Sequence, residues 1–446
     1  MSILYIYVNT ENIKITRVTL VSGKSCMGIS INLEFGDGDF EHGFNRSQFI
    51  VTIATLDLQS TQIVAQLSPS PEIPRLYQDW KHQYHNLIRQ QRGFNNDRPT
   101  HISSKSCQKQ AKALRRQLHE WLKPLSLELE PILQQYRADE IHLVIHTQKV
   151  TSPITKDTLH RLPWQEWDLS SHLSEGNNSI NYTGEASLCF NFNKANTVIN
   201  SNNNKIRRVK IISIFGSSEG INTNQDRYLI SNLKRRGAEL TYLTEPSRAD
   251  FIQLWEQDCD ILFFAGHSET QSDTQTGVIN INPRDKLSLA EIKKTLRAAI
   301  AKGLKLAIFN SCDGLGLAKE LADLNLPYII VWREVVPDVI AQKFIEHFLS
   351  SFAEGKSLFA SVKEARDKLY ELAERESLEK QLSGITWLPI ICQTTNEPPP
   401  SWSDLGGLTG TLPDNPYRGL AAFREEDAPF YFGREKFIAV FGRGCL

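Results

Sequence analysis

Two apolar stretches of this sequence end in side chains that can do nucleophilic chemistry. One runs over Asp260–Ala265 and is followed, after a single glycine, by His267. The other runs over Leu304–Phe309 and is followed, after an Asn-Ser pair, by Cys312. Such runs predict buried parallel strands, and open α/β sheets place their reacting groups at the C-terminal ends of these strands. A thiol and an imidazole at one sheet edge are a candidate nucleophile and base.

The pattern of the sequence between His267 and Cys312 predicts that the two residues lie close together. They are 45 positions apart (312 minus 267), with one predicted helix between the strands. A right-handed crossover then makes the strands sheet neighbours with adjacent C-terminal ends. A helix is expected directly after Cys312, and a helix N-terminus favours the thiolate. The N–H groups of Ser268 and Cys312 would form an oxyanion hole. The alternative is a small buried cysteine and a surface histidine without catalytic roles.

Strands and helices alternate over the C-terminal half of the chain, which predicts a mostly parallel α/β sheet with helices on both faces. The predicted strands are Val209–Phe215, Leu240–Leu243, Asp260–Ala265, Leu304–Phe309, Tyr328–Val331 and Trp387–Cys392. The predicted helices are Asp226–Arg236, 247–257, Ser288–Ala301, Leu315–Leu324, Pro337–Phe352 and Ser357–Glu374. Before this unit, β-branched runs predict strands to about residue 67, and helical spacing then predicts helices over about 76–91 and 105–136.

The length of 446 residues favours two or three domains. We predict an N-terminal region of unknown role over 1–139, the α/β unit over 140–396, a proline-containing linker over 397–414, and a separate fragment over 415–446. The linker assignment rests on a stiff run of three prolines at its start.

Composition narrows the classes of function. A net charge of −1 gives no global field toward nucleic acid or an anionic membrane, so neither is an expected partner. The first residues lack a secretory signal pattern, and no apolar run approaches the ~18 residues that span a bilayer. The seven cysteines are scattered without a CxxC pair, which argues against a disulfide framework and a zinc site. We therefore expect a cytoplasmic protein without a metal or another cofactor.

Several ordered motifs resemble one known family. They are Arg161–Trp167, Phe264–Ser268, Phe309–Ala318, Arg333–Asp338 and Trp387–Pro389. Together they make about residues 140–395 resemble a CHAT domain, the caspase- and separase-like branch of the caspase-fold cysteine peptidases. The resemblance implies a caspase-like fold, with His267 as general base or acid and Cys312 as nucleophile. It also implies cleavage of a protein or peptide substrate by a signalling or stress-response protein. Because the Gln-Ala-Cys signature of true caspases is absent, aspartate specificity is not expected.

Two acidic residues are candidates for substrate binding. Asp226 stands at the start of the helix after the first strand, a region that shapes the first specificity pocket in this fold. A carboxylate there can receive a basic side chain through charge-assisted hydrogen bonds. The alternative is an acid favoured by the helix macrodipole alone. Asp313, next to the predicted nucleophile, is the second candidate.

The C-terminal fragment resembles a different family. Asn415–Phe423 and Asp427–Glu435 are similar to the opening of a STAND-type signalling ATPase. The last residues, Ala439–Leu446, lack the Gly-Lys-Ser/Thr of a phosphate loop, so we expect a truncated domain without ATP binding. This fragment motivates a competing hypothesis, a non-catalytic or latent signalling adaptor that binds a partner through residues 1–139. A nucleotide-binding Rossmann protein is disfavoured because no phosphate-binding fingerprint is present.

Overall fold

The structure is a computed structural model of the chain. It describes residues 2–9, 12–19, 28–45, 49–55, 60–91, 104–135, 140–167, 183–190, 208–217, 222–254, 257–270, 277–311, 314–375, 383–395 and 397–410.

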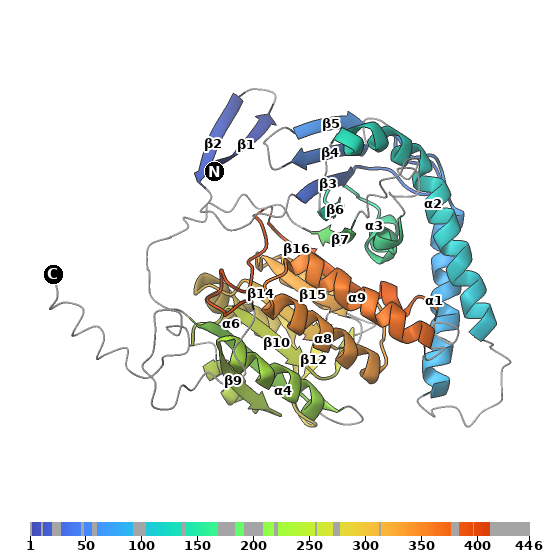
Figure 1. The fold of residues 1–446 in the computed structure, drawn as a ribbon. Coiled ribbons are helices and arrows are strands. Elements are labelled where there is room, and N and C mark those ends of the chain that lie inside the picture. The colour runs from blue at the N-terminus through green and yellow to red at the C-terminus, as the bar shows by residue number, and fades with distance from the viewer. Residues whose placement is uncertain are drawn as a thin grey trace, which may run out of the picture.

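One large sheet organises the described part of the chain. Its strands are β3 (Gly28–Phe35), β4 (Phe49–Thr55), β5 (Ser60–Val64), β6 (Glu140–His146), β7 (Thr183–Cys189), β8 (Val209–Phe215), β9 (Ala238–Thr244), β10 (Ile261–Ala265), β14 (Leu306–Asn310), β15 (Tyr328–Trp332) and β16 (Pro389–Gln393). Their order is β5-β4-β3-β6-β7-β16-β15-β14-β10-β8-β9 (Figure 1). From β9 to β15 all neighbours are parallel, and β16 runs antiparallel to β15. The neighbours β16, β7, β6 and β3 are again parallel, and β4 and β5 close that end as antiparallel strands.

Helices cover both faces of this sheet, as the alternating pattern predicts. They are α1 (Glu72–Gln91), α2 (Ser104–Gln135), α3 (Pro153–Arg161), α4 (Thr223–Asn232), α5 (Arg248–Leu254), α6 (Leu289–Ala301), α7 (Gly314–Ala322), α8 (Asp338–Ala353) and α9 (Leu358–Arg375). On one face, Trp332 of β15 packs against Phe344 of α8, with ring centroids 5.2 Å apart. On the other face, α5 and α6 lie over β8, β10 and β14. The predicted α/β fold with a mostly parallel sheet is therefore confirmed.

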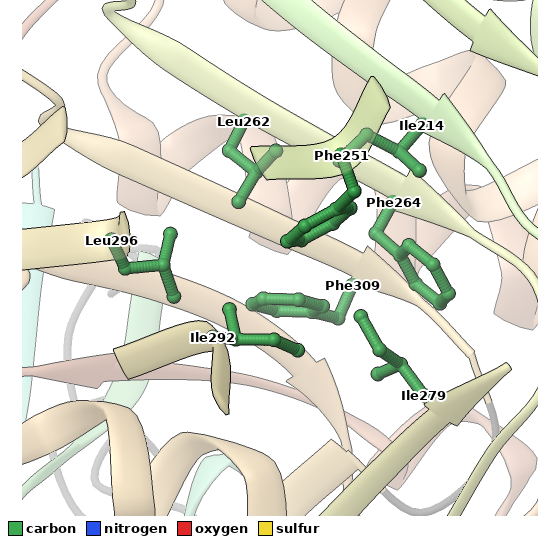
Figure 2. Close-up of a pocket in the computed structure, with 8 residues that line it drawn as sticks. All are labelled: Ile214, Phe251, Leu262, Phe264, Ile279, Ile292, Leu296 and Phe309. Atoms are coloured by element: carbon green, nitrogen blue, oxygen red, sulfur yellow. The ribbon is translucent and has the colours of Figure 1, made fainter. Parts of the chain in front are cut away.

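The core under α5 and α6 is apolar throughout. Figure 2 shows Phe251 of α5 and two side chains of α6 facing strand side chains that include Phe264 and Phe309. A gap of only about 10 Å³ remains between them, lined by apolar atoms. A space of that size holds about one water-sized sphere, and an apolar lining leaves it dry. We therefore interpret it as imperfect core packing beneath the strand ends, not as a ligand site.

The N-terminal region consists of strands followed by helices, as predicted. A hairpin of β1 (Ser2–Asn9) and β2 (Asn12–Thr19) precedes β3. Helices α1 and α2 lie side by side at one side of the molecule (Figure 1). Strand β3 pairs in parallel with β6, so strands on both sides of residue 139 belong to the same sheet. The boundary predicted between residues 139 and 140 thus falls within a continuous sheet, and the domain division remains a prediction.

A small antiparallel sheet follows β10 and was not predicted. It consists of β11 (Ser268–Thr270), β12 (Gly277–Asn280) and β13 (Lys286–Ser288). Short strands of mixed polar residues carry little periodicity, which explains why the sequence pattern missed them. The helix start that follows was predicted correctly. Ser288 and Glu291 form a capping box, with Glu291 Oε2 accepting from Ser288 N at 2.9 Å.

The first part of the predicted linker packs on the α/β unit. Trp402 is completely buried, and its indole ring lies edge-on to Phe352 with centroids 5.9 Å apart. Its Nε1 donates to the carbonyl of Arg236 at 2.9 Å, and so does the N–H of Leu408. Residues 397–410 therefore cover the turn between α4 and β9. No helix among the described residues has the length and apolar character needed to cross a membrane.

Candidate active site

The two chemistry-bearing strand ends lie side by side. Strands β10 and β14 are parallel neighbours, and Ala265 is the register partner of Asn310. His267 and Cys312 each follow this pair by two residues, so both segments leave the sheet at the same edge. The predicted pairing of the two strands is confirmed. Cys312 itself lies outside the described residues, so its role remains a prediction.

A main-chain hydrogen bond ties the half-buried His267 to Asn280. The His267 carbonyl accepts from Asn280 N at 2.9 Å, so His267, just before β11, and Asn280, at the end of β12, stand at a hydrogen-bonded position of the ladder. In an antiparallel ladder the next pair, Ser268 and Ile279, is of the non-hydrogen-bonded kind. The N–H of Ser268 is therefore directed away from β12. This orientation agrees with the predicted donor role of Ser268 and does not test it.

The loop after β8 is hydrogen-bonded to the two segments next to His267, the end of β10 and the end of β12. Gly216 N donates to the carbonyl of Ala265 at 2.8 Å, and Ser217 N donates to the carbonyl of Asn280 at 3.0 Å. A Cβ on Gly216 would lie 2.3 Å from that Asn280 oxygen, which excludes any side chain. The contact between β8, β10 and β12 thus depends on a glycine at this position.

Helix α7 starts where the sequence predicts, two residues after Cys312. A Cβ on its first residue, Gly314, would lie 2.8 Å from Cβ of Val331, so glycine lets the helix begin directly against β15. The partial positive charge of a helix N-terminus stabilises a nearby thiolate. The position of α7 therefore suits an activated cysteine at residue 312. Asp313 lies outside the described residues, and its predicted substrate role remains a prediction.

The second substrate candidate, Asp226, lies buried beneath the end of β14. Its side chain is 2% exposed, and its Oδ1 accepts from Asn310 Nδ2 at 2.7 Å. Asn310 Oδ1 in turn accepts from Trp332 Nε1 at 3.2 Å. Burial raises the pKa of Asp226 to about 7, and the negative charge of Asp338 on α8 adds to the shift. The structure thus brings Asp226 to the candidate site, and its role toward substrate remains a prediction.

Sequence reasoning assigned no role to Asn310 or Trp332. The available signal was a single polar residue, Asn310, at the end of an otherwise apolar strand. Such a residue is exposed at the sheet edge or is hydrogen-bonded inside, and its neighbours in sequence do not distinguish the two.

The described cysteines do not provide an alternative nucleophile. Cys107, Cys189, Cys259 and Cys392 are buried thiols outside any disulfide. Burial raises the pKa to about 12 for both Cys189 and Cys259, and it raises the pKa of Cys392 further. A thiol that stays protonated at neutral pH is a poor nucleophile. Cys259, to which the sequence pattern assigned no function, is accordingly a structural residue.

Comparison with known proteins identifies the family. The family model described as CHAT domain matches residues 178–412, which is 235 of the 446 residues (412 minus 178, plus one). The chain therefore belongs to the CHAT domain family, and the resemblance inferred from the motifs is confirmed. The matched segment begins later and ends later than the predicted range of about 140–395. The STAND-like residues 415–446 lie outside this match and outside the described residues, so that resemblance remains a prediction.

Three solved structures show a distant similarity to this chain. The complex of pro- and mature domains of RgpB from Porphyromonas gingivalis is 10% identical, with a TM-score of 0.35, and the match covers 72% of this chain and 75% of that one. The Arg-specific cysteine proteinase gingipain R is 9% identical with a TM-score of 0.36, and the match covers 72% of this chain and 74% of that one. The Drosophila initiator caspase Dronc is 10% identical with a TM-score of 0.27, and the match covers 37% of this chain and 75% of that one. A comparison with curated protein sequences finds no match. The family assignment therefore rests on the CHAT match.

Proposed function

We propose that this protein is a cysteine endopeptidase that uses a Cys312–His267 dyad. The observation that supports this proposal most is the register of β10 and β14, which pairs Ala265 with Asn310, the residues two positions before His267 and Cys312 in the sequence. The start of α7 directly after Cys312 adds an electrostatic reason for a thiolate at that position.

The proposed reaction is hydrolysis of a peptide bond through an acyl-enzyme. His267 takes the proton of the Cys312 thiol, and the sulfur attacks the carbonyl carbon and forms a C–S bond, while the carbonyl electron pair moves to oxygen. N–H groups of Ser268 and Cys312 stabilise this oxyanion. The C–N bond then breaks, and His267 delivers its proton to the leaving amine. Water, deprotonated by His267, hydrolyses the thioester and regenerates the thiol.

Substitution of the dyad tests the proposal. Cys312→Ala and His267→Ala should each lower cleavage of a peptide library by about 10³-fold or more, because each removes a group that takes part in bond making. Cys259→Ala is the matched control, since it removes a buried thiol with a raised pKa and should leave cleavage unchanged. Cleavage by Cys312→Ala at the wild-type rate would refute the proposal.

The substrate is proposed to be a protein or peptide. Asp226 and Asp313 are proposed to contribute to its binding, and a reducing compartment such as the cytoplasm would keep the nucleophilic thiol free. The alternative hypothesis, a latent or non-catalytic adaptor acting through residues 1–139, makes the opposite prediction for thiol chemistry. A peptide-based thiol-reactive reagent should label Cys312 selectively in a peptidase and should show no selectivity in an adaptor.

A further inference from the structure

A buried chain of hydrogen bonds crosses three elements beneath the candidate site. Asp226 comes from α4, Asn310 is the last residue of β14, and Trp332 is the last residue of β15. All three side chains are at least nine-tenths buried. The chain runs from Trp332 Nε1 through the Asn310 amide to Asp226 Oδ1.

The chemistry of the three groups leaves the Asn310 amide only one orientation. An indole N–H can only donate, so the Asn310 oxygen must face Trp332 and its NH₂ must face Asp226. A flipped amide would set its NH₂ group against the indole N–H, so that two donors faced each other. The end of β14 is therefore held from both sides, and Cys312 follows this held residue by two positions.

The geometry points to Asn310 as a positioning residue for the nucleophile, with the Asp226 carboxyl and the Trp332 indole fixing its amide. This inference rests on the proposed peptidase function, since it concerns where the chain delivers Cys312. Asp226 then acts through Asn310, whereas the substrate hypothesis requires it to bind a basic side chain directly. The two roles predict different results for the same variants.

The groups around Asp226 determine its protonation state within the Trp332–Asn310–Asp226 hydrogen-bond chain. Its hydrogen-bonded neighbour on β14 is the neutral Asn310, and β15 contributes the neutral Trp332 beyond it. From α8 it faces the carboxylate of Asp338 and the neutral amide of Gln342. Burial with only neutral donors favours the protonated acid, which agrees with a pKa of about 7.

Three variants separate these roles. Asn310→Leu keeps the branched shape and the number of heavy atoms of the side chain but removes both hydrogen bonds, so kcat should fall about 10- to 100-fold with KM changed less than twofold. Asn310→Asp places a second carboxyl against Asp226. The two must then share a proton, so cleavage should be lost at pH 8 and largely recovered near pH 5.5, where Asn310→Leu stays impaired. Asp226→Asn keeps an acceptor for Asn310 and removes the negative charge, so any change in cleavage should be the same fold-change for basic and neutral substrates.

Two readouts do not depend on peptidase activity. The alkylation rate of Cys312 by iodoacetamide should fall at least tenfold in Asn310→Leu, measured well below its melting temperature. Asp226→Asn should match wild-type thermal stability near pH 4 and exceed it by about 5 °C at pH 8, because a buried acid with a raised pKa weakens folding as pH rises through that range.

The outcomes decide between the roles. Folded Asn310→Leu with wild-type cleavage and alkylation rates overturns the inference. A loss confined to basic substrates in Asp226→Asn overturns it in favour of direct substrate binding. A Tm difference between Asp226→Asn and wild type that does not change between pH 4 and pH 8 overturns the claim that Asp226 is a buried acid with a raised pKa. If Cys312→Ala cleaves normally, the proposed function fails, while the alkylation rate still reports on the strand end.

Discussion

Replacing Glu334 with glutamine tests how the N-terminal region is attached to the α/β unit. The Glu334 carboxylate is 1% exposed and follows β15 by two residues. Four donors converge on it: Tyr77 OH at 2.6 Å, Lys81 Nζ at 2.8 Å, His85 Nε2 at 2.9 Å and Arg161 Nη1 at 2.7 Å. The first three come from one stripe of α1 with a spacing of four residues.

The pKa of Glu334 sets the size of the effect. Burial alone would raise it, but the hydrogen bond from His85 and the charges of Arg161 and Lys81 lower it from 4.5 to about 2. A depressed carboxyl pKa adds stability above pH 4.5 that is lost as pH falls through the folded-state pKa. A shift of about 2.5 pH units corresponds to about 3 kcal/mol at neutral pH. Glutamine also leaves the partly buried Lys81 and Arg161 without their counter-charge, so 3 kcal/mol is the lower end of the expected loss.

Thermal unfolding measures this loss. Taking about 2 cal/mol/K per residue for the unfolding entropy, Glu334→Gln should melt about 3 °C below wild type at pH 7. The gap should shrink as pH falls from 4.5 toward 2, because wild-type Glu334 then gains its proton. Glu371→Gln is the control, since that carboxylate pairs with Lys368 on the exposed face of α9 and should shift Tm by less than 1 °C. A Glu334→Gln protein as stable as wild type at pH 7 would refute the assigned role of this carboxylate.

Three further predictions follow from the described contacts. Trp402→Ala should destabilise the protein by about 3–5 kcal/mol and expose residues 397–410 to limited proteolysis, because it removes a buried indole and its bond to Arg236. Wild-type resistance to protease would contradict the docking of that segment. Gly216→Ala should displace β12 from β8 and lower peptide cleavage, since its Cβ would lie 2.3 Å from Asn280 O; unchanged activity would show that the loop can yield. Cys189 and Cys259 should resist alkylation at pH 7.5 until the protein is unfolded, as mass spectrometry of modified peptides can show.

The arrangement of β10 and β14 could be predicted because its signals are local. Each strand is a short apolar run that ends at polar residues, and a helix between them requires a parallel crossover. Their pairing and the start of α7 follow from these patterns and from the handedness rule. The small sheet β11–β13 has no such signal, because its strands are short and polar and pair only with one another.

The support beneath the site could not be predicted, because it depends on contacts between distant residues. Asp226 and Asn310 are 84 positions apart, and each has an adequate local interpretation. An acid in the first turns of a helix is favoured by the macrodipole, and an asparagine at a strand end is normal at a sheet edge. Only their packing shows that the acid is buried and that the amide bridges it to Trp332.

The α1 stripe shows the same difficulty on a larger scale. Tyr77, Lys81 and His85 repeat at a spacing that, on sequence alone, describes a polar helix face turned to solvent. Their partner, Glu334, lies about 250 residues further along the chain, in the loop that follows β15. The buried carboxylate accounts for the inward orientation of that face, because a buried charge without partners is costly and these three side chains supply donors to it. Charge and hydrogen bonds therefore bind helix α1 to the loop after β15, the strand next to β14. We expect a substitution in α1 or in this loop to change the stability of both.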